Sequence, residues 1–483
     1  MPDCDLLIRN ATVIDGTGAA RQTAEVAIRG DRIAAVGKLG NASAAEEIDA
    51  AGLALAPGFI DTHAHDDLAL LNTPLMEPKI SQGVTCVING NCGLSIAPLP
   101  TPKAPPAPLD LLSPDAADFF PSVAACFAAR EARPAALNSA QLVGHTTLRL
   151  AHMDDLDRPA SEREIAAMRA SLETALQEGA IGLSTGTYYP PAAAAPTEEV
   201  IALAEALRCH GGIHATHMRD EADGVLDAIE ETGRIGRAAG VPCVISHHKC
   251  NGLANHGRSV ETLALIDRLA ETQELGLDAY PYAASSTTLS IDKVKAASRT
   301  IVSWSRPHPE HAGRDLDDVA QEMGVSIEAA VAALSPAGGI FFSMAEEDVR
   351  RILAHERTMI GSDGLPADPH PHPRLWGAFA RVLGHYARDE GLFSLEEAVR
   401  KMTALPAARY GLTGRGRVHE GYFADLVLFD PATIADAATY DAPAAPARGI
   451  EMVIVNGQPV WRDGAPTGRT PGRVLKNAAT HAL

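Results

Sequence analysis

The chain has 483 residues, 46% of them hydrophobic, and a formal net charge of −20. This length favours one large domain with a smaller one, since single hydrophobic cores stop growing at about 250–300 residues. The acidic balance argues against nucleic acid or an anionic membrane as a partner. The sequence has no apolar run of about 18 residues, the length that would predict a membrane span.

The N-terminus and the cysteines predict a cytoplasmic location. Asp3, Asp5 and Arg9 interrupt the apolar run that a secretory signal requires. The seven cysteines are an odd number spread along the chain. They are expected as thiols or metal ligands in a reducing compartment rather than as a disulfide framework.

Short strands broken by turns are predicted at both ends of the chain. Residues 5–37 alternate apolar and polar side chains between turn signals. Residues 424–464 have the same character and include an Asn-Gly hairpin turn. We therefore predict a small β-sandwich domain built from residues 1–57 and 415–483, with a large domain between its two parts.

The middle of the chain alternates apolar runs with amphipathic helices. The strand-like runs are residues 83–89, 179–184, 211–217, 242–248, 274–280 and 358–363. Helical periodicity covers residues 161–179, which start with a capping box, and residues 260–275. Such units imply parallel strands, and over about 350 residues a (β/α)₈ barrel fits better than an open sheet, although the pattern allows both. We predict the α/β class, with a TIM-like barrel over residues 58–414 and an inserted lid at 285–345.

Metal-ligating residue types follow the ends of the predicted strands. They are His63, His65, Cys92, His217, His247 and Asp363. Strand carboxyl ends form the catalytic face of a barrel, and the i, i+2 spacing places His63 and His65 on one side. Imidazole, thiolate and carboxylate together suit zinc better than magnesium or calcium. Each histidine alone also fits a hydrogen-bonded core position, and Asp363 alone fits a turn, but their recurrence at separate strand ends favours a metal site.

The motifs around these residues resemble those of a known family. APGFIDTHAHDD and HEGYFADLVLFD resemble the amidohydrolase superfamily, whereas GNCG, THMRDE, SHHKC, DAYPY and IGSDGLP are similar to its N-acyl-D-amino-acid deacylases. The resemblance covers nearly the whole chain and implies a barrel with a β-sandwich side domain. It also implies zinc-dependent hydrolysis of N-acyl-D-amino acids to a D-amino acid and a carboxylate.

The resemblance implies a role for each metal-site residue. A tight zinc site would consist of Cys92, His217 and His247, and a weaker metal position of His63, His65 and Asp363. One metal is expected to suffice, with Asp363 taking a proton from the attacking water and returning it to the leaving amine. Tyr189 is a candidate donor to the carbonyl oxygen, although a packed aromatic ring explains it about as well.

Two other functions remain as alternatives. A hydantoinase or dihydroorotase would share the superfamily, but many of its binuclear members bridge two metals with a carboxylated lysine after the fourth strand. This chain has no lysine between Lys103 and Lys249. A non-catalytic metal-binding barrel is disfavoured by the complete ligand set.

Three residues resemble the family's clamp for the α-carboxylate of the substrate, namely Lys249, Tyr280 and Arg374. A guanidinium can bind a carboxylate through two parallel hydrogen bonds, and a surface arginine is the alternative for Arg374. Selectivity for the D-enantiomer rests on the resemblance alone. The expected partner is a small N-acyl-amino acid, and the sequence does not specify the oligomeric state.

The side-chain pocket is predicted around Asn251, residues 285–295 including Ser286, and Met344. Met344 favours an apolar wall, whereas Lys295, with Lys293 beside it, favours an acidic substrate such as N-acyl-D-glutamate. In family members that prefer hydrophobic substrates, an aliphatic residue is expected near the position of Lys295. The lysine in this chain therefore favours a substrate with an acidic side chain.

Overall fold

A computed structural model of the protein describes residues 3–477, in which eight parallel strands form a nearly closed barrel. Around the sheet they are β16 (Thr358–Ile360), β12 (Leu275–Ala279), β11 (Cys243–Ile245), β10 (Ile213–His217), β9 (Gly182–Gly186), β8 (Asn138–Gly144), β7 (Val84–Asn89) and β6 (Phe59–Asp61). The two end strands approach each other just beyond their last residues, where the Asp363 amide donates to the His63 carbonyl at 2.8 Å. The predicted fold class is confirmed.

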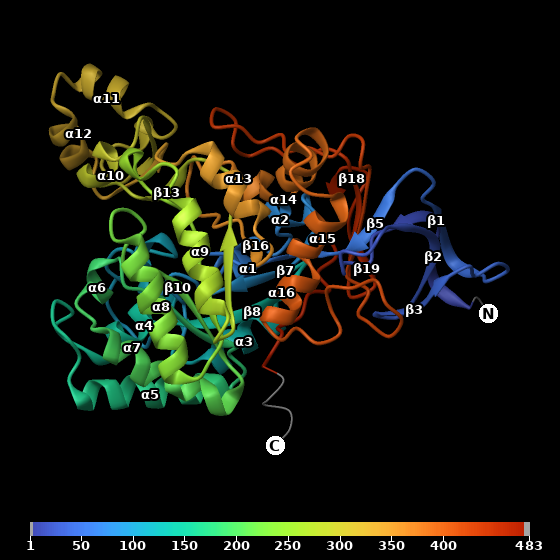
Figure 1. Ribbon diagram of the computed structural model, residues 1–483, viewed down its shortest axis with the longest axis horizontal. Coiled ribbons are helices and arrows are strands. Elements are labelled where there is room, and N and C mark those ends of the chain that lie inside the picture. The colour runs from blue at the N-terminus through green and yellow to red at the C-terminus, as the bar shows by residue number, and fades with distance from the viewer. Residues whose placement is uncertain (1–2, 478–483) are drawn as a thin grey trace.

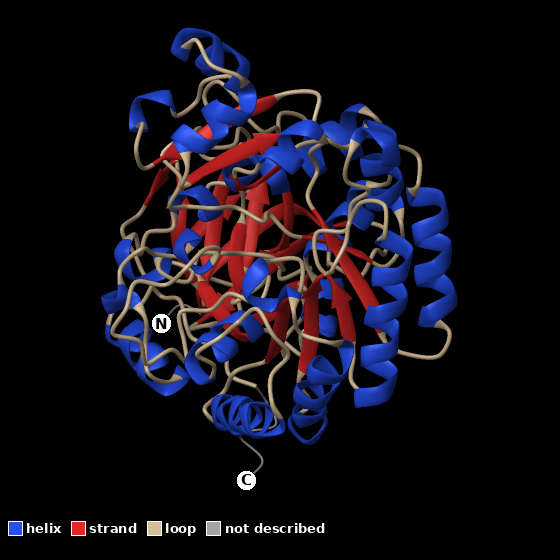
Figure 2. Cartoon of the chain, turned by 90° about the vertical axis from the view of Figure 1, so that its left-hand side faces the viewer, coloured by secondary structure: helices blue, strands red, loops and turns tan. Residues whose placement is uncertain are grey.

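Helices surround the barrel strands (Figure 2). They include α1 (Ala69–Asn72), α2 (Glu77–Ile80), α3 (Val123–Ala132), α4 (His145–His152), α5 (Glu162–Gln177), α6 (Pro190–Ala193), α7 (Thr197–Ala204), α8 (Val225–Ala239), α9 (Ser259–Ala270), α13 (Glu346–Ala354), α14 (Arg374–Arg381), α15 (Leu395–Met402) and α16 (Ala404–Arg409). Ser161 and Glu164 cap α5 reciprocally, as predicted. Among residues 3–477, no helix has both the length and the apolar character needed to cross a bilayer.

Both ends of the chain contribute to a second, nine-stranded mixed sheet (Figure 1, right). Its strands are β1 (Cys4–Val13), β2 (Gln22–Arg29), β3 (Arg32–Gly37), β4 (Ala44–Asp49), β5 (Ala54–Pro57), β17 (Leu426–Phe429), β18 (Ile450–Val455), β19 (Gln458–Arg462) and β20 (Ala465–Pro466). The two halves join where β5 pairs with β17 in antiparallel register, with Leu55 opposite Leu428. This sheet therefore brings residues nearly 400 positions apart into one layer.

The C-terminal segment then returns to the barrel. Gly472 donates a backbone hydrogen bond to the Ala135 carbonyl at 2.9 Å. Val474 forms a parallel bridge with Ser139 at the start of β8, and Leu475 donates to the Ser139 carbonyl at 2.8 Å. The tail thus adds backbone pairing at the amino-terminal end of a barrel strand.

Residues 285–341, between β12 and β16, form an insert with its own small core (Figure 1, top left). It contains the antiparallel sheet β13–β15–β14 (Ser285–Thr288, Ala337–Phe341 and Thr300–Ser305) and the helices α10 (Ile291–Lys295), α11 (Leu316–Met323) and α12 (Ile327–Leu334). Leu289, Val302, Leu316 and Phe341 are buried together in it. Because β13 leaves the barrel directly after β12, the insert lies beside the carboxyl ends of the strands.

Candidate metal centre

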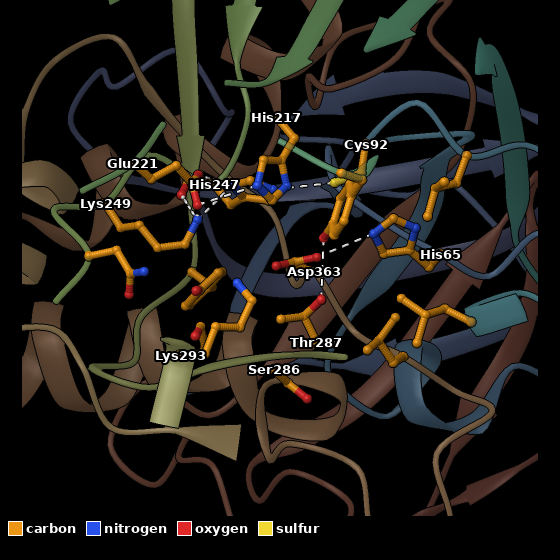
Figure 3. A pocket seen from close by; sticks show the side chains of 17 residues that line it. His65, Cys92, His217, Glu221, His247, Lys249, Ser286, Thr287, Lys293 and Asp363 are labelled. Carbon is orange, nitrogen blue, oxygen red and sulfur yellow. Dashed lines mark hydrogen bonds and ion pairs between the residues drawn. The ribbon is translucent and has the colours of Figure 1, made fainter. Parts of the chain in front are cut away.

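Six side chains from five strand ends converge in the barrel mouth, and all of them except His63 are labelled in Figure 3. They are His63 and His65 after β6, Cys92 after β7, His217 at the end of β10, His247 after β11 and Asp363 after β16. All six are buried. His248, beside His247, faces the other way and contacts the Thr262 hydroxyl at 2.9 Å.

The Cys92 thiol lies at the junction of two ligand groups. Its Sγ is 3.1 Å from Nε2 of His63 and 3.3 Å from Nε2 of His247. Two sets of donor atoms each lie within 4.8 Å of one another, Cys92, His217 and His247 in the first and His63, His65, Cys92 and Asp363 in the second. Burial opposes ionisation of Cys92, but the charges of His63 and His247 hold its thiol pKa well below the usual value.

These donors fit a zinc ion. Within the described residues, neither ring nitrogen of the buried His217 forms a hydrogen bond, and Glu221 Oε2 lies 3.5 Å from its Nε2. Such orphaned nitrogens are costly unless something else binds them. A thiolate with two imidazoles is a ligand set that zinc accepts, and it leaves room for a fourth ligand.

Three of the six residues have a left-handed backbone, with φ of +56° at Cys92, +37° at His247 and +50° at Asp363. Non-glycine residues in this region cost about 1–3 kcal/mol each and persist where their surroundings hold them. The Asp278 carboxylate accepts from the His247 amide at 2.8 Å, and the Asp363 amide donates to the His63 carbonyl at 2.8 Å. His247 and Asp363 are therefore fixed by the neighbouring strand ends.

Two buried carboxylates that the sequence analysis did not single out contact the histidines. Glu221 Oε1 lies 2.9 Å from Nδ1 of His247 and 2.6 Å from Nζ of Lys249. Asp278 Oδ1 lies 3.4 Å from Nδ1 of His63. A carboxylate beside the remote ring nitrogen fixes the tautomer and orientation of a ligating histidine. Burial raises the pKa of Glu221, but Lys249 above all outweighs it and holds this pKa well below the usual range.

Arg374 is a buried neighbour of Asp363 rather than a surface arginine, since only 1% of the residue is exposed. Its Nη1 lies 2.9 Å from Asp363 Oδ2, and its Nη2 donates to the Ser286 carbonyl at 3.2 Å. The guanidinium carbon lies 4.5 Å from the centroid of the Tyr280 ring. Lys249 Nζ lies 6.0 Å from the same ring, so the three predicted clamp residues lie together.

The ligands open into a pocket with about 490 Å³ of atom-free space. The predicted site residues that line it are His65, Cys92, Tyr189, His217, His247, Lys249, Asn251, Tyr280, Ser286 and Asp363. The Tyr189 hydroxyl lies 3.3 Å from Thr287 Oγ1 of the insert, and its ring centroid lies 4.9 Å from that of His217. Burial raises the pKa of Tyr189 well above its usual value, so the hydroxyl stays protonated.

Two residues predicted for the side-chain pocket lie outside this cavity. Lys295 is exposed and pairs with Glu328 at 3.5 Å, and Met344 lines a neighbouring cavity with Tyr282. Lys293 lines the pocket instead, with Nζ 4.3 Å from the centroid of the Tyr188 ring. Residues two apart on a helix differ by about 200° around its axis, so α10 turns only one of the two lysines inward.

The sequence matches the family model described as "Amidohydrolase family" over residues 46–461. It is 57% identical to a D-aminoacylase of Alcaligenes xylosoxydans xylosoxydans over 98% of both chains. It is 53% identical to an N-acyl-D-aspartate deacylase of the same organism, over 98% of this chain and 95% of the relative.

Solved structures are similar over the full length. One is a D-aminoacylase with a binuclear metal centre, described by one-metal activation and second-metal attenuation, at 55% identity and a TM-score of 0.95, covering 98% of this chain and 100% of that one. Another is the N-acyl-D-glutamate deacylase of Bordetella bronchiseptica with zinc and a phosphonate inhibitor, at 46% identity and a TM-score of 0.95, covering 98% and 99%. An L-hydantoinase of Arthrobacter aurescens shares the fold alone, at 14% identity and a TM-score of 0.61. The match covers 98% of this chain and 100% of the hydantoinase.

Proposed function

The chain belongs to the amidohydrolase family and is a metal-dependent N-acyl-D-amino-acid deacylase, and from this premise we propose that it prefers substrates with an acidic side chain. The observation that carries the proposal is that one pocket holds both the metal ligands and a half-buried lysine, Lys293. The same pocket offers Lys249, which like Arg374 lies near the Tyr280 ring, as a partner for the α-carboxylate.

Zinc would be held by Cys92, His217 and His247, and a second, weaker metal by His63, His65 and Asp363 beside the same Cys92 thiol. When bound, zinc supplies Lewis acidity, which lowers the pKa of a water ligand towards about 7 and polarises a carbonyl. The orphaned ring nitrogens of His217 and the lowered thiol pKa of Cys92 support the first assignment. The solved relative with a binuclear centre supports the second.

Asp363 would act as the general base and then as the general acid. Its Oδ1 lies 3.3 Å from Nε2 of His65, so this oxygen points among the ligands. From there the carboxylate can accept a proton from the attacking water and deliver it to the amide nitrogen as the C–N bond breaks. The second transfer is required because an amide anion is a poor leaving group.

The remaining polar groups would orient the substrate. The neutral Tyr189 hydroxyl would donate a hydrogen bond to the carbonyl oxygen, where negative charge develops. Arg374, Lys249 and Tyr280 would bind the α-carboxylate. Arg374 and Lys249 already face Asp363 and Glu221, and these partners keep the two cations in place before the substrate enters.

Lys293 would pair with the side-chain carboxylate of the substrate. Its side chain extends from α10 towards the ligand cluster (Figure 3). The contact with the Tyr188 ring face stabilises the ammonium group at the pocket mouth. The 53% identity to a relative that acts on an N-acyl-D-aspartate supports this preference, whereas the D-aminoacylase at 57% leaves a broader preference as the competing result.

The test compares Lys293→Met with Lys295→Met, a matched lysine on the outer side of the same helix. A hydrogen bond to a charged group contributes about 1.5–3 kcal/mol, so Lys293→Met should lower kcat/KM for N-acetyl-D-glutamate or N-acetyl-D-aspartate about 10- to 100-fold. The value for N-acetyl-D-methionine should change little, and Lys295→Met should leave all three substrates unaffected. An equal loss on all three, or wild-type protein that favours N-acetyl-D-methionine, would refute the acidic preference.

A further inference from the structure

A fully buried lysine lies beneath the weaker metal position. Lys79, on α2, is 0% exposed. Its Nζ lies 2.7 Å from Asp61 Oδ2, 3.2 Å from Asp66 Oδ2 and 2.7 Å from Ser362 Oγ. An ammonium group has three donors, and burying it is costly unless they are matched. Three acceptors around Nζ meet that requirement, so the surroundings of Lys79 are built to hold its charge.

The partners of Lys79 join the two loops that carry metal ligands. Asp61 Oδ1 accepts from the His63 amide at 3.2 Å and from the Ser362 amide at 2.8 Å. The Ser362 hydroxyl donates to Asp61 Oδ2 at 2.6 Å and accepts from the Gly364 amide at 3.1 Å. Asp61 therefore bridges the ends of β6 and β16, and Ser362, which it holds, contacts the Gly364 amide on the other side of the strained residue Asp363.

We infer that Lys79 is a positioning residue for the weaker metal position. Its ammonium group fixes the Asp61 carboxylate and the Ser362 hydroxyl, and through them the backbone that carries His63, His65 and Asp363. Loss of the ammonium group would leave two buried carboxylates, Asp61 and Asp66, without their shared cation. This inference rests on the proposed function, because it concerns the metals of that site.

The two metal positions should respond differently to the loss of Lys79. Cys92, His217 and His247 follow β7, β10 and β11, and the contacts of Lys79 lead instead to the β6 and β16 loops. Replacing a partner that orients metal ligands typically costs 10- to 100-fold in metal affinity. We therefore expect Lys79→Met to weaken the second metal by about this factor and to leave the first within about threefold.

Lys401 provides a matched control. It is also 0% exposed, on α15, but its Nζ contacts the His355 carbonyl and lies 3.6 Å from Glu397. Lys401→Met therefore removes a buried ammonium group whose contacts do not include the ligand loops among the described residues. If both variants lose a similar amount of thermal stability, a difference in metal binding between them reflects positioning rather than a general loss of stability.

The experiment titrates metal-stripped full-length protein with Zn²⁺ by calorimetry and with Co²⁺ by absorption. The cobalt–thiolate band reports coordination by Cys92, whose thiol belongs to both donor sets, so the order of the binding steps distinguishes the two positions. We expect Lys79→Met to retain the thiolate band and the affinity of the first binding step. Its affinity for the second metal should fall 10- to 100-fold, so that any effect of the second metal on turnover requires correspondingly more zinc. Lys401→Met should titrate like the wild type.

Several results would overturn the inference. These are a normal second step in Lys79→Met, equal weakening of both steps, or the same shift in Lys401→Met. If Lys79→Met does not fold, Ser362→Ala removes one hydroxyl from the same network, and an unchanged second step in it would be equally decisive. Wild-type protein that binds one metal and deacylates would refute the role of Lys79 alone, whereas wild-type protein that binds no metal would refute the proposed function.

Discussion

Replacing Asp363 with asparagine keeps the size of the side chain but removes its charge and its basicity. The carboxylate faces His65 at 3.3 Å and Arg374 at 2.9 Å, and an asparagine oxygen can still accept from either. The first ligand set, Cys92, His217 and His247, does not include Asp363, so tight zinc binding should persist. A positioned general acid–base group contributes about 10²–10⁴ in rate, or about 3–5 kcal/mol at 1.36 kcal/mol per tenfold.

We therefore expect kcat of Asp363→Asn to fall by about 10²–10⁴ while one zinc per chain is retained. The assay measures D-amino-acid release from the best substrate of an N-acetyl panel, together with metal content. Asp368→Asn is the control, because Asp368 is a buried aspartate of the same loop that belongs to neither ligand set. If kcat stayed within about threefold of the wild type with zinc bound, the assignment of Asp363 as base would be refuted. Such a loss is far smaller than the one expected from removing a general base.

Removing the metal with a chelator should abolish turnover, and one equivalent of Zn²⁺ should restore it; full activity in metal-free protein would contradict the mechanism. Cys92→Ser should lower zinc affinity by at least about 10-fold, measured by competition with a chromophoric chelator, because a hydroxyl is a poorer ligand than a thiolate. Arg374→Lys should lower kcat/KM about 10- to 100-fold through lost bidentate binding, and an unchanged value would exclude Arg374 from the clamp. Ser161→Ala should reduce the free energy of unfolding by about 1 kcal/mol without changing kcat, as measured by denaturant titration.

The sequence predicted those parts of the fold that depend on local pattern. The apolar run at residues 211–217 ends on His217 as β10 does, and the capping box starts α5 at Ser161. The strand β8 was missed because its sequence, NSAQLVG, mixes polar residues into a fully buried strand. The side-chain amide nitrogen of Gln141 in that strand donates to Asp67 at 2.9 Å, a contact that no periodicity reveals. Propensity and pattern therefore failed where tertiary hydrogen bonds replace apolar burial.

The site shows the same limit. The ligands were recognisable because each follows a strand end, and such ends meet in a barrel. Glu221 and Lys79 gain their significance from contacts with Lys249 and Asp61, which lie 28 and 18 residues away and on other elements. The choice between Lys293 and Lys295 depended on the rotation of a five-residue helix, which composition does not specify.

The return of the C-terminal tail to the barrel has a consequence for biosynthesis. Ser139 in β8 is translated more than 330 residues before Val474, its partner in the bridge. Domains usually fold as units while the ribosome extends the chain. Here the Ser139 backbone amide and carbonyl bond to Arg473 and Leu475, so this pairing must wait until that segment has been made. Synthesis of the segment, rather than completion of the barrel sequence, is therefore the step that completes the pairing at this end of β8.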